Sequence, residues 1–251
     1  MIKQYKTEVI AVGTELLLGQ ISNTNAQWIS QQLALKGLNT YFHTVVGDNI
    51  NRVENVFVKA HDRSDIIIVT GGLGPTDDDL TREAFQKIYK NEIITEEVAL
   101  NKIVEFYKRQ NTIMTPNNKK QARVFKESIV IPNEVGMAPG MIVNYEERIW
   151  VFLPGVPREM KSMATNTVFP YLQKLNGDSV IKSKVLRFVG IGESKLEHEL
   201  KELIESQNNP TIAPLAEKSG VTIRLTAKSE NESTATELLE STKQKVLEKV
   251  G

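Results

Sequence analysis

The sequence DIIIVTGGLGPTDDDLTR, residues 65–82, places a glycine-rich turn and three consecutive aspartates directly after an apolar run. Residues 66–69 are all β-branched, which is typical of a central parallel strand covered on both faces. Gly71, Gly72 and Gly74 let the backbone turn tightly, and apolar residues at helical spacing predict a helix immediately afterwards. The unpaired amides and the positive dipole end of that helix favour an anion above the glycine turn.

The three aspartates that follow the glycines allow two interpretations. Asp77, Asp78 and Asp79 are expected in the first turn of the helix, where each acid would contribute ~0.3–1 kcal/mol by capping it. Three adjacent carboxylates repel one another, however, so capping alone explains the run poorly. The alternative interpretation is that these acids bind a ligand or a metal ion.

The composition is that of an ordinary globular protein, and it excludes several kinds of site. The 251 residues are 40% hydrophobic, with 31 Lys and Arg residues against 31 Asp and Glu residues. The net charge of zero and the lack of a basic block argue against nucleic acid or an anionic membrane as partner. No cysteine is present, which excludes disulfides and thiolate metal sites. The N-terminal residues form no long apolar segment, so we expect a cytoplasmic protein.

Strand and helix patterns alternate along the first part of the chain. Apolar strands at residues 7–12, 39–46 and 66–69 are separated by helices at 25–36 and 52–61. This order predicts an α/β fold with a mostly parallel sheet between two layers of helices. The later predicted elements are a helix at 96–109, strands near Ile129 and at 141–145 and 149–153, and a helix after LPGVPREM.

A second, smaller α+β domain is expected after the polar sequence LNGDS at residues 175–179. We place the domains at 1–174 and 180–251. The predicted elements of the second domain are a strand at 185–189, a helix with a Ser194–Glu197 capping box, an alternating strand at 221–228 and a final helix. The sequence ends within the last predicted helix, without a cap or a polar tail, which leaves two alternatives: the natural chain ends here, or it continues beyond Gly251.

Four turns after predicted strands each combine glycine with an acidic residue. The acids are Glu15, Asp48, the aspartate run and Glu159. Ligands of open parallel sheets bind beyond the carboxyl ends of the strands, so these turns are expected to share one rim. Several carboxylates without cysteine favour a hard divalent cation, with Mg²⁺ the first candidate and Mn²⁺ or Co²⁺ the others.

These segments together resemble one known family. VGTELLLGQISNTNA, VGDN, VTGGLGPTDDDLT, NKKQA, GMAPGM and LPGVPREM are similar, in this order, to the N-terminal part of the CinA (competence/damage-inducible) family. The resemblance covers essentially the whole chain and implies a molybdopterin-binding-like domain followed by a KH-like domain. It also implies that Asp48 and Asp79 match acidic positions used by molybdopterin-binding relatives, and that Asp78 belongs to the DDxT form typical of CinA-like chains.

The resemblance implies a metal-dependent hydrolase that splits the pyrophosphate of ADP-ribose or a related dinucleotide. The products would be AMP and a sugar phosphate. A nicotinamide-nucleotide deamidase domain, which many members carry, would lie beyond Gly251, so no deamidase activity is expected. Relatives commonly pair through such small domains, and a homodimer is expected here too.

Our leading hypothesis assigns roles along this rim. Catalysis would fall to Asp78, Asp79 and Glu15, with Glu15 orienting water, and the metal would be held by Asp48, Asp78 and Asp79. The expected ligand-binding residues are Gly71, Gly72, Gly74, Thr76, Asn25, Lys119, Lys120, Gln121, Gly155 and Glu159. The competing interpretation of the lysine pair at 119–120 is a solvated surface turn.

Two other classes of function stay open at this point. The same rim could bind molybdopterin or a nucleotide without hydrolysing it, because glycine amides and a lysine loop suffice for binding. A module for DNA uptake or repair is suggested by the family name alone. Neither the charge of the chain nor a motif supports this last class, because the sequence GIGES at residues 190–194 stands where a nucleic-acid-binding KH module has its GXXG loop.

Overall fold

The isoleucine run forms the strand β3 (Ile66–Thr70), whose five residues are all buried. The structure is a computed structural model that describes residues 5–176, 180–217 and 220–250. The chain divides into two units, of residues 1–32 with 38–172 and of residues 33–37 with 173–251. The expected linker falls partly on residues 177–179, which lie outside the described residues.

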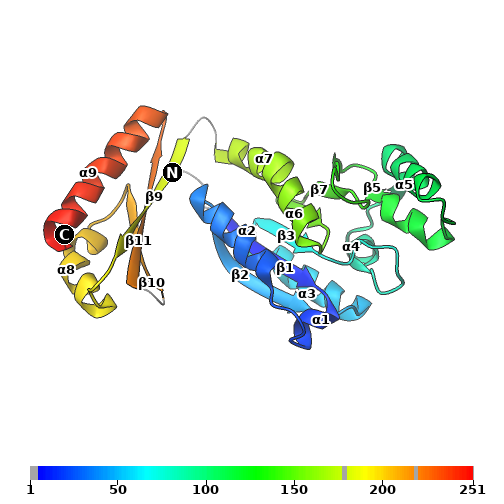
Figure 1. Cartoon of the computed structure of the whole chain (residues 1–251), viewed down its shortest axis with the longest axis horizontal. Coiled ribbons are helices and arrows are strands. Elements are labelled where there is room, and N and C mark those ends of the chain that lie inside the picture. The colour runs from blue at the N-terminus through cyan, green and yellow to red at the C-terminus, as the bar shows by residue number, and fades with distance from the viewer. Residues whose placement is uncertain (1–4, 177–179, 218–219, 251) are drawn as a thin grey trace. The chain divides into compact units, whose positions relative to one another are not determined.

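A six-stranded sheet with the order β2-β1-β3-β8-β7-β6 forms the centre of the first unit (Figure 1). The strands that flank β3 are β1 (Lys6–Val12) and β8 (Arg148–Leu153), and both run parallel to it. The strand β2 (Asn39–Val46) runs parallel to β1. The strand β7 (Gly140–Tyr145) is antiparallel to β8, and β6 (Ile129–Ile131) is antiparallel to β7. The prediction of a mostly parallel α/β sheet is confirmed.

Helices cover both faces of this sheet, which gives the expected three layers. One face carries α2 (Thr24–Leu35) and the continuous helical run α6 (Pro157–Met163), π-helical turn η2 (Ala164–Val168) and α7 (Phe169–Gln173) (Figure 1). The other face carries α3 (Ile50–Arg63) and α4 (Thr81–Tyr89).

An aromatic cluster joins α3 and α4 to the sheet. The ring of Phe85 lies 5.1 Å from that of Trp150 and 5.0 Å from that of Phe152, and Phe57 lies 5.3 Å from Trp150. These centroid distances suit edge-to-face packing, which adds ~0.5–1.5 kcal/mol per pair to the burial itself. The cluster holds α4 in place, and with it the loop that leads from β3 into the helix.

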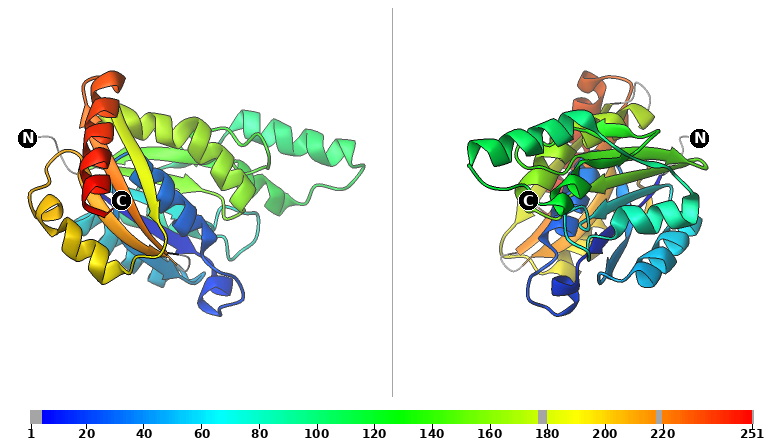
Figure 2. Two further views of the ribbon diagram at one scale, coloured as in Figure 1. Left: turned by 60° about the vertical axis from the view of Figure 1, so that its left-hand side comes forward. Right: turned by 90° about the vertical axis from the view of Figure 1, so that its right-hand side faces the viewer.

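Several short elements of the first unit extend the predicted pattern. The turn after β1 contains the one-turn helix α1 (Thr14–Leu17), which projects from the body of the unit in both views of Figure 2. The strands β4 (Ile93–Thr95) and β5 (Arg123–Phe125) pair antiparallel, and they were not predicted. Between them lie the predicted helix, α5 (Glu97–Arg109), and a 3₁₀ helix η1 (Pro116–Ala122).

The second unit is a three-stranded antiparallel sheet, in the order β10-β11-β9, with helices on one face (Figure 1). Its elements are η3 (Lys174–Asn176), β9 (Val180–Phe188), α8 (Glu193–Glu205), β10 (Thr211–Glu217), β11 (Gly220–Ser229) and α9 (Glu232–Val250). Leu196 and Leu200 of α8 and Leu239 of α9 share a core with Ile223 and Leu225 of β11. The smaller α+β domain is therefore confirmed. Within the described ranges, no helix has the length and apolar character needed to cross a bilayer.

Two details of the second unit differ from the prediction. The strand β10 was missed, because Pro214 lies within it and proline disfavours a strand assignment except at an edge, which is where β10 lies. The Ser194 capping box is wrong, because α8 already begins at Glu193 and its N-cap is Gly192, without a side-chain hydrogen bond.

A buried carboxylate ties three elements of the first unit together. Glu8 on β1 is fully buried and accepts hydrogen bonds from Arg63 Nη2 at 2.6 Å, Thr44 Oγ1 at 2.7 Å and Ser64 Oγ at 3.0 Å. The guanidinium of Arg63 also lies 4.0 Å from the centre of the Phe42 ring. Burial acts to raise the pKa of Glu8, but the hydrogen bonds from Arg63, Thr44 and Ser64 outweigh it, and the pKa lies below its ordinary value of 4.5.

The substitution Glu8→Gln is expected to lower the free energy of unfolding by roughly 1–3 kcal/mol at neutral pH, because charged hydrogen bonds become neutral ones. A lowered folded pKa stabilises the protein above the unfolded pKa of about 4.5, and this stability is lost as the pH falls through the folded pKa. Urea unfolding measured from pH 7 to pH 3 should therefore show a smaller loss of stability in Glu8→Gln than in the unsubstituted chain. The exposed Glu127→Gln is the matched control, and an acid response in Glu8→Gln equal to that of the control would contradict this account.

Candidate functional site

A pocket of about 500 Å³ lies at the carboxyl ends of the parallel strands. It is formed by the loops that follow β1, β2, β3 and β8, as expected for an open parallel sheet. Its lining residues are Val12, Gly13, Glu15, Asp48, Gly71, Gly72, Leu73, Gly74, Pro75, Asp78, Asp79, Gln121, Ala138, Pro154, Gly155, Val156 and Glu159.

The loops after β1 and β2 are joined by a pair of reciprocal hydrogen bonds. The backbone amide of Thr14 donates to Asp48 Oδ2 at 2.7 Å, and the amide of Asp48 donates to Thr14 Oγ1 at 3.1 Å. The amide of Gly13 donates to the carbonyl oxygen of Val46 at 2.9 Å. The carboxylate of Asp48 therefore supports the start of α1 at the edge of the pocket.

The glycine loop after β3 is closely packed against its neighbours. A Cβ atom on Gly71 would lie 2.2 Å from the carbonyl oxygen of Val12, and one on Gly72 would lie 2.1 Å from Thr81 Oγ1. Both glycines have positive φ, of 96° and 67°, which other residues rarely adopt. Thr81 Oγ1 donates to the carbonyl oxygen of Gly71 at 2.9 Å. These two positions therefore admit only glycine without movement of β1 or α4.

The amides of this loop differ in their availability. The amide of Gly71 donates to the carbonyl oxygen of Leu153 at 3.0 Å, so it is already used within the sheet edge. The amides of Gly72 and Gly74 make no hydrogen bond to another residue in the part of the chain that the structure describes. Partner-free amides in the wall of a pocket suit an anionic ligand.

The aspartate run lies before α4, not in its first turn as expected. Asp79 Oδ2 accepts hydrogen bonds from Thr76 N at 2.9 Å and Thr76 Oγ1 at 2.6 Å, which closes a turn ahead of the helix start at Thr81. Lys120 Nζ donates to the carbonyl oxygens of Thr76 at 2.9 Å and Asp79 at 2.6 Å. The Thr76 side chain lowers the pKa of Asp78, which is ionised at neutral pH.

Arg82 is a site residue that the sequence reasoning missed. It is fully buried behind the pocket wall, where Nη2 donates to the carbonyl oxygens of Leu73 at 3.1 Å and Gln121 at 3.4 Å. Its Nε and Nη1 atoms have no hydrogen-bond partner among the described residues. Burial lowers the pKa of Arg82 to about 10, so the guanidinium keeps its positive charge at neutral pH. The available signal was its helical spacing with Phe85, which puts it on the inward face of α4.

The loop after β8 is held from two sides. Asn25 Nδ2 donates to the carbonyl oxygen of Gly155 at 2.7 Å, which links α2 to this loop. Glu159 Oε2 accepts a hydrogen bond from Asn133 Nδ2 at 2.6 Å, and a Cβ atom on Gly136 would lie 2.1 Å from Glu159 Cδ. Asn133 was not among the predicted site residues.

Ten of the residues predicted for the site line this one pocket: Glu15, Asp48, Gly71, Gly72, Gly74, Asp78, Asp79, Gln121, Gly155 and Glu159. Asn25 lines an adjoining pocket of about 80 Å³, together with Glu15 and Gly155. Thr76, Lys119 and Lys120 are not in the lining. Lys120 donates hydrogen bonds to the aspartate turn and is not part of the pocket lining, so it does not cover the pocket as expected.

The carboxylates do not form a ready metal site. Within residues 5–176, 180–217 and 220–250, no group of three or more His, Asp or Glu side chains is placed to hold a metal ion. Asp48 has an oxygen hydrogen-bonded to the loop after β1, and Asp79 has one hydrogen-bonded within its own loop. A divalent cation bound by Asp48, Asp78 and Asp79 stays a prediction.

Comparison with known families agrees with the architecture of both units. Residues 8–174 match the family model described as "Probable molybdopterin binding domain", and residues 183–251 match that of the "Damage-inducible protein CinA KH domain". The crystal structure of the protein CinA from Thermoplasma acidophilum superposes with a TM-score of 0.60 and is 34% identical. The match covers 66% of this chain and 97% of that one.

Curated relatives match over nearly the whole of this chain. The competence-damage inducible protein of Oceanobacillus iheyensis is 56% identical over 251 residues, and that of Halalkalibacterium halodurans is 53% identical over 246 residues. The matches cover 100% and 98% of this chain. The chain spans only 60% and 59% of the length of these two relatives.

The prediction of an ADP-ribose pyrophosphatase is wrong. The matching family model describes a molybdopterin-binding domain, and the relatives are described as competence-damage inducible proteins, neither of which is a hydrolase description. The metal-dependent reaction depended on Asp48 and Asp79, but in the structure Asp48 joins the loops after β1 and β2, and Asp79 closes the turn before α4. The agreement of both domain models with the two units and the identity to these relatives show that the chain belongs to the CinA family.

Proposed function

We propose that the first unit is a binding domain for a phosphorylated heterocycle, a molybdopterin or a nucleotide, which it holds without hydrolysing. The observation that carries the proposal is the pairing of partner-free amides at Gly72 and Gly74 with the buried guanidinium of Arg82 behind the same loop. The amides would donate to phosphate oxygens directly. Arg82 would add positive potential from behind the wall, where low polarity strengthens its effect.

The acids of the pocket support this assignment to binding. Asp48 joins the loops after β1 and β2 through its hydrogen bond with Thr14, and Asp79 closes the loop after β3 through its hydrogen bond with Thr76. The other acids of the lining, Glu15, Asp78 and Glu159, would face the part of the ligand that carries hydrogen-bond donors, such as amino groups of a pterin or purine ring. The volume of about 500 Å³ falls within the ordinary range of small-molecule sites.

Calorimetric titration of the chain with molybdopterin, AMP and ADP is the direct test. At least one of these ligands is expected to bind without added metal, and the unphosphorylated adenosine is expected to bind about tenfold or more weakly than AMP if the nucleotide is the ligand. Each titration is repeated with Mg²⁺ and with EDTA, because a divalent cation at Asp48, Asp78 and Asp79 is part of the prediction still to be tested. Absence of binding by all three phosphorylated ligands in both conditions would refute the proposal.

Substitution of Gly72 by alanine is expected to weaken binding of the phosphorylated ligand at least about tenfold. The added Cβ atom would collide with Thr81 Oγ1 at 2.1 Å in a backbone conformation with positive φ. The strain is expected to cost ~1–3 kcal/mol in unfolding free energy. Gly192→Ala is the matched control, since that glycine has negative φ and open space around its Cβ position. Equal affinity in Gly72→Ala and Gly192→Ala would exclude the glycine loop from ligand binding.

Substitution of Arg82 by methionine separates binding from stability. Among the described residues the buried guanidinium has no salt bridge and its Nε and Nη1 atoms have no hydrogen-bond partner, so its removal is expected to leave the unfolding free energy unchanged or higher. The affinity for the phosphorylated ligand is expected to fall about tenfold because the positive potential behind the loop is lost. Urea unfolding and calorimetry on the same sample measure both quantities. A variant that is destabilised but binds normally would assign Arg82 a purely structural role.

The remaining expectations concern the surroundings of the protein. A cytoplasmic location, a small-molecule ligand in place of nucleic acid or membrane, and a homodimer stay predictions. The activity of the longer relatives is not carried over, because this chain spans only 60% of the length of the first of them.

A further inference from the structure

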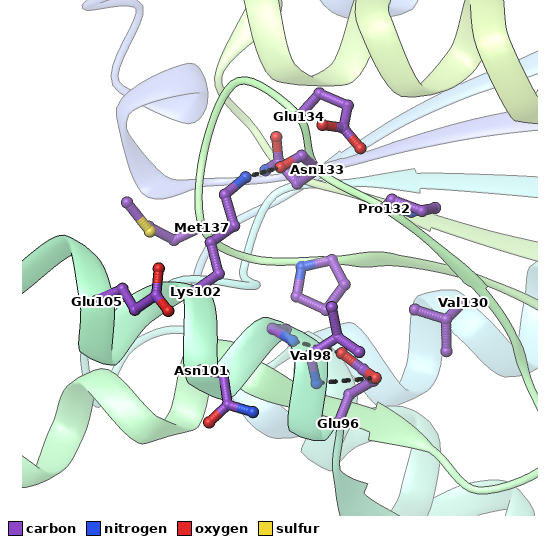
Figure 3. A pocket seen from close by; sticks show the side chains of 12 residues that line it. Glu96, Val98, Asn101, Lys102, Glu105, Val130, Pro132, Asn133, Glu134 and Met137 are labelled. Atoms are coloured by element: carbon purple, nitrogen blue, oxygen red, sulfur yellow. Dashed lines mark hydrogen bonds between the residues drawn. The ribbon is translucent and has the colours of Figure 1, made fainter.

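A second pocket, of about 590 Å³, lies between α5 and the segment from β6 to β7 (Figure 3). Helix α5 and its N-cap contribute Glu96, Val98, Ala99, Asn101, Lys102 and Glu105, and the opposite wall contributes Val130, Pro132, Asn133, Glu134, Met137 and Pro139. It shares no lining residue with the pocket at the strand ends. The proposed function therefore makes no use of it.

Six of the twelve lining residues of the second pocket are apolar. Val98 leaves 76% of its surface exposed, which is high for a valine in a folded domain. Met137, labelled in Figure 3, belongs to the same lining and packs on the small core formed by Ala99, Ile103 and Ala122. Methionine adapts its shape to different apolar groups, which suits a ligand-binding wall.

The ammonium group of Lys102, in the lining, already has a hydrogen-bond partner in the pocket wall. Lys102 reaches from α5 across to the backbone carbonyl oxygen of Asn133 and donates a hydrogen bond to it (Figure 3). The ammonium group is therefore bound to the wall of the pocket. An anionic ligand would have to displace this bond in order to use Lys102.

The carboxylates of the pocket are available to different degrees. Glu96 accepts hydrogen bonds from the amides of Val98 at 3.2 Å and Ala99 at 2.5 Å, and so caps α5. Glu105 pairs with Arg109 at 3.0 Å, but both side chains are exposed and such pairs are weak. Glu134 has no hydrogen-bond partner among the described residues. The lining thus contains three carboxylates and the hydrogen-bonded ammonium group of Lys102, which together give the pocket a net negative charge.

We propose that this pocket is a second ligand site, selective for a small organic cation that carries an ammonium group on an apolar body. The body would lie on the apolar part of the lining, beside Val98, and the ammonium group would donate to one of the two exposed carboxylates at the rim, Glu134 or Glu105. The volume is in the range of pockets that enclose small molecules.

The test is a titration of the full chain, labelled with ¹³C at the methionine methyl groups, by phenethylammonium. Of the five methionines that the structure describes, Met137 is the one in the lining, so its methyl signal, assigned through Met137→Leu, reports on this pocket. The signal is expected to shift saturably with phenethylammonium, and the affinity for 2-phenylethanol and for 3-phenylpropanoate is expected to be about tenfold or more lower.

Substitution of the carboxylates at the rim tests whether they cause the selectivity for an ammonium group. The double variant Glu105→Gln with Glu134→Gln is expected to weaken phenethylammonium binding about tenfold. Glu97→Gln, an exposed acid on the same helix outside the lining, is expected to bind as the unsubstituted chain does. Three results would each overturn the proposal: no saturable shift of Met137, equal affinity for the three probes, or an equal loss in Glu97→Gln and the double variant. The experiment uses no ligand of the first pocket. A negative result would therefore leave the proposed function of the first unit untouched, and the reverse also holds.

Discussion

The arrangement of the first unit depends on the close approach of the loop after β3 to the end of β1. At Gly71 there is no room for a side chain beside the carbonyl oxygen of Val12, and at Gly72 the hydroxyl of Thr81 occupies the corresponding space. This contact sets where α4 begins, because Thr81 bonds to the carbonyl oxygens of Gly71 and Gly72 through its hydroxyl and its amide. The direction of α4 in turn buries Arg82 and places the aspartate turn at the pocket rim.

Two buried charges among the described residues of the first unit, Glu8 and Arg82, have opposite consequences for the fold. Glu8 has Arg63, Thr44 and Ser64 as partners, so its ionised form is favoured and it stabilises the junction of β1, β2 and α3. The hydrogen-bond partners of Arg82 within the described part of the chain are carbonyl oxygens, and burial makes its charged form less favourable than in water. A buried, ionised side chain whose pKa is shifted by burial beside a pocket is typical of a functional site.

Most of the first unit could be predicted from the sequence because its elements are long and strongly periodic. The run at residues 66–69 and the strands at either side of it have the apolar character of a covered sheet, and the turns at Glu15, Asp48 and Glu159 followed from the topology. The start of α4 could not be predicted, because contacts with the loop decide it and not the preference of aspartate for a first turn. Arg82 was missed because charged residues are normally exposed, and only tertiary packing shows that this one is not. Asn133 was missed because it is distant in sequence from every predicted site residue.

Asn133 lines the second pocket and is hydrogen-bonded to Glu159, which lines the first. Its carbonyl oxygen accepts from Lys102 on one side, and its side-chain amide donates to Glu159 on the other. A molecule that displaces this segment from one side would therefore alter the position of Glu159 on the opposite side. Linkage makes such an influence mutual and equal in free energy, so each compartment would sense the occupancy of its neighbour.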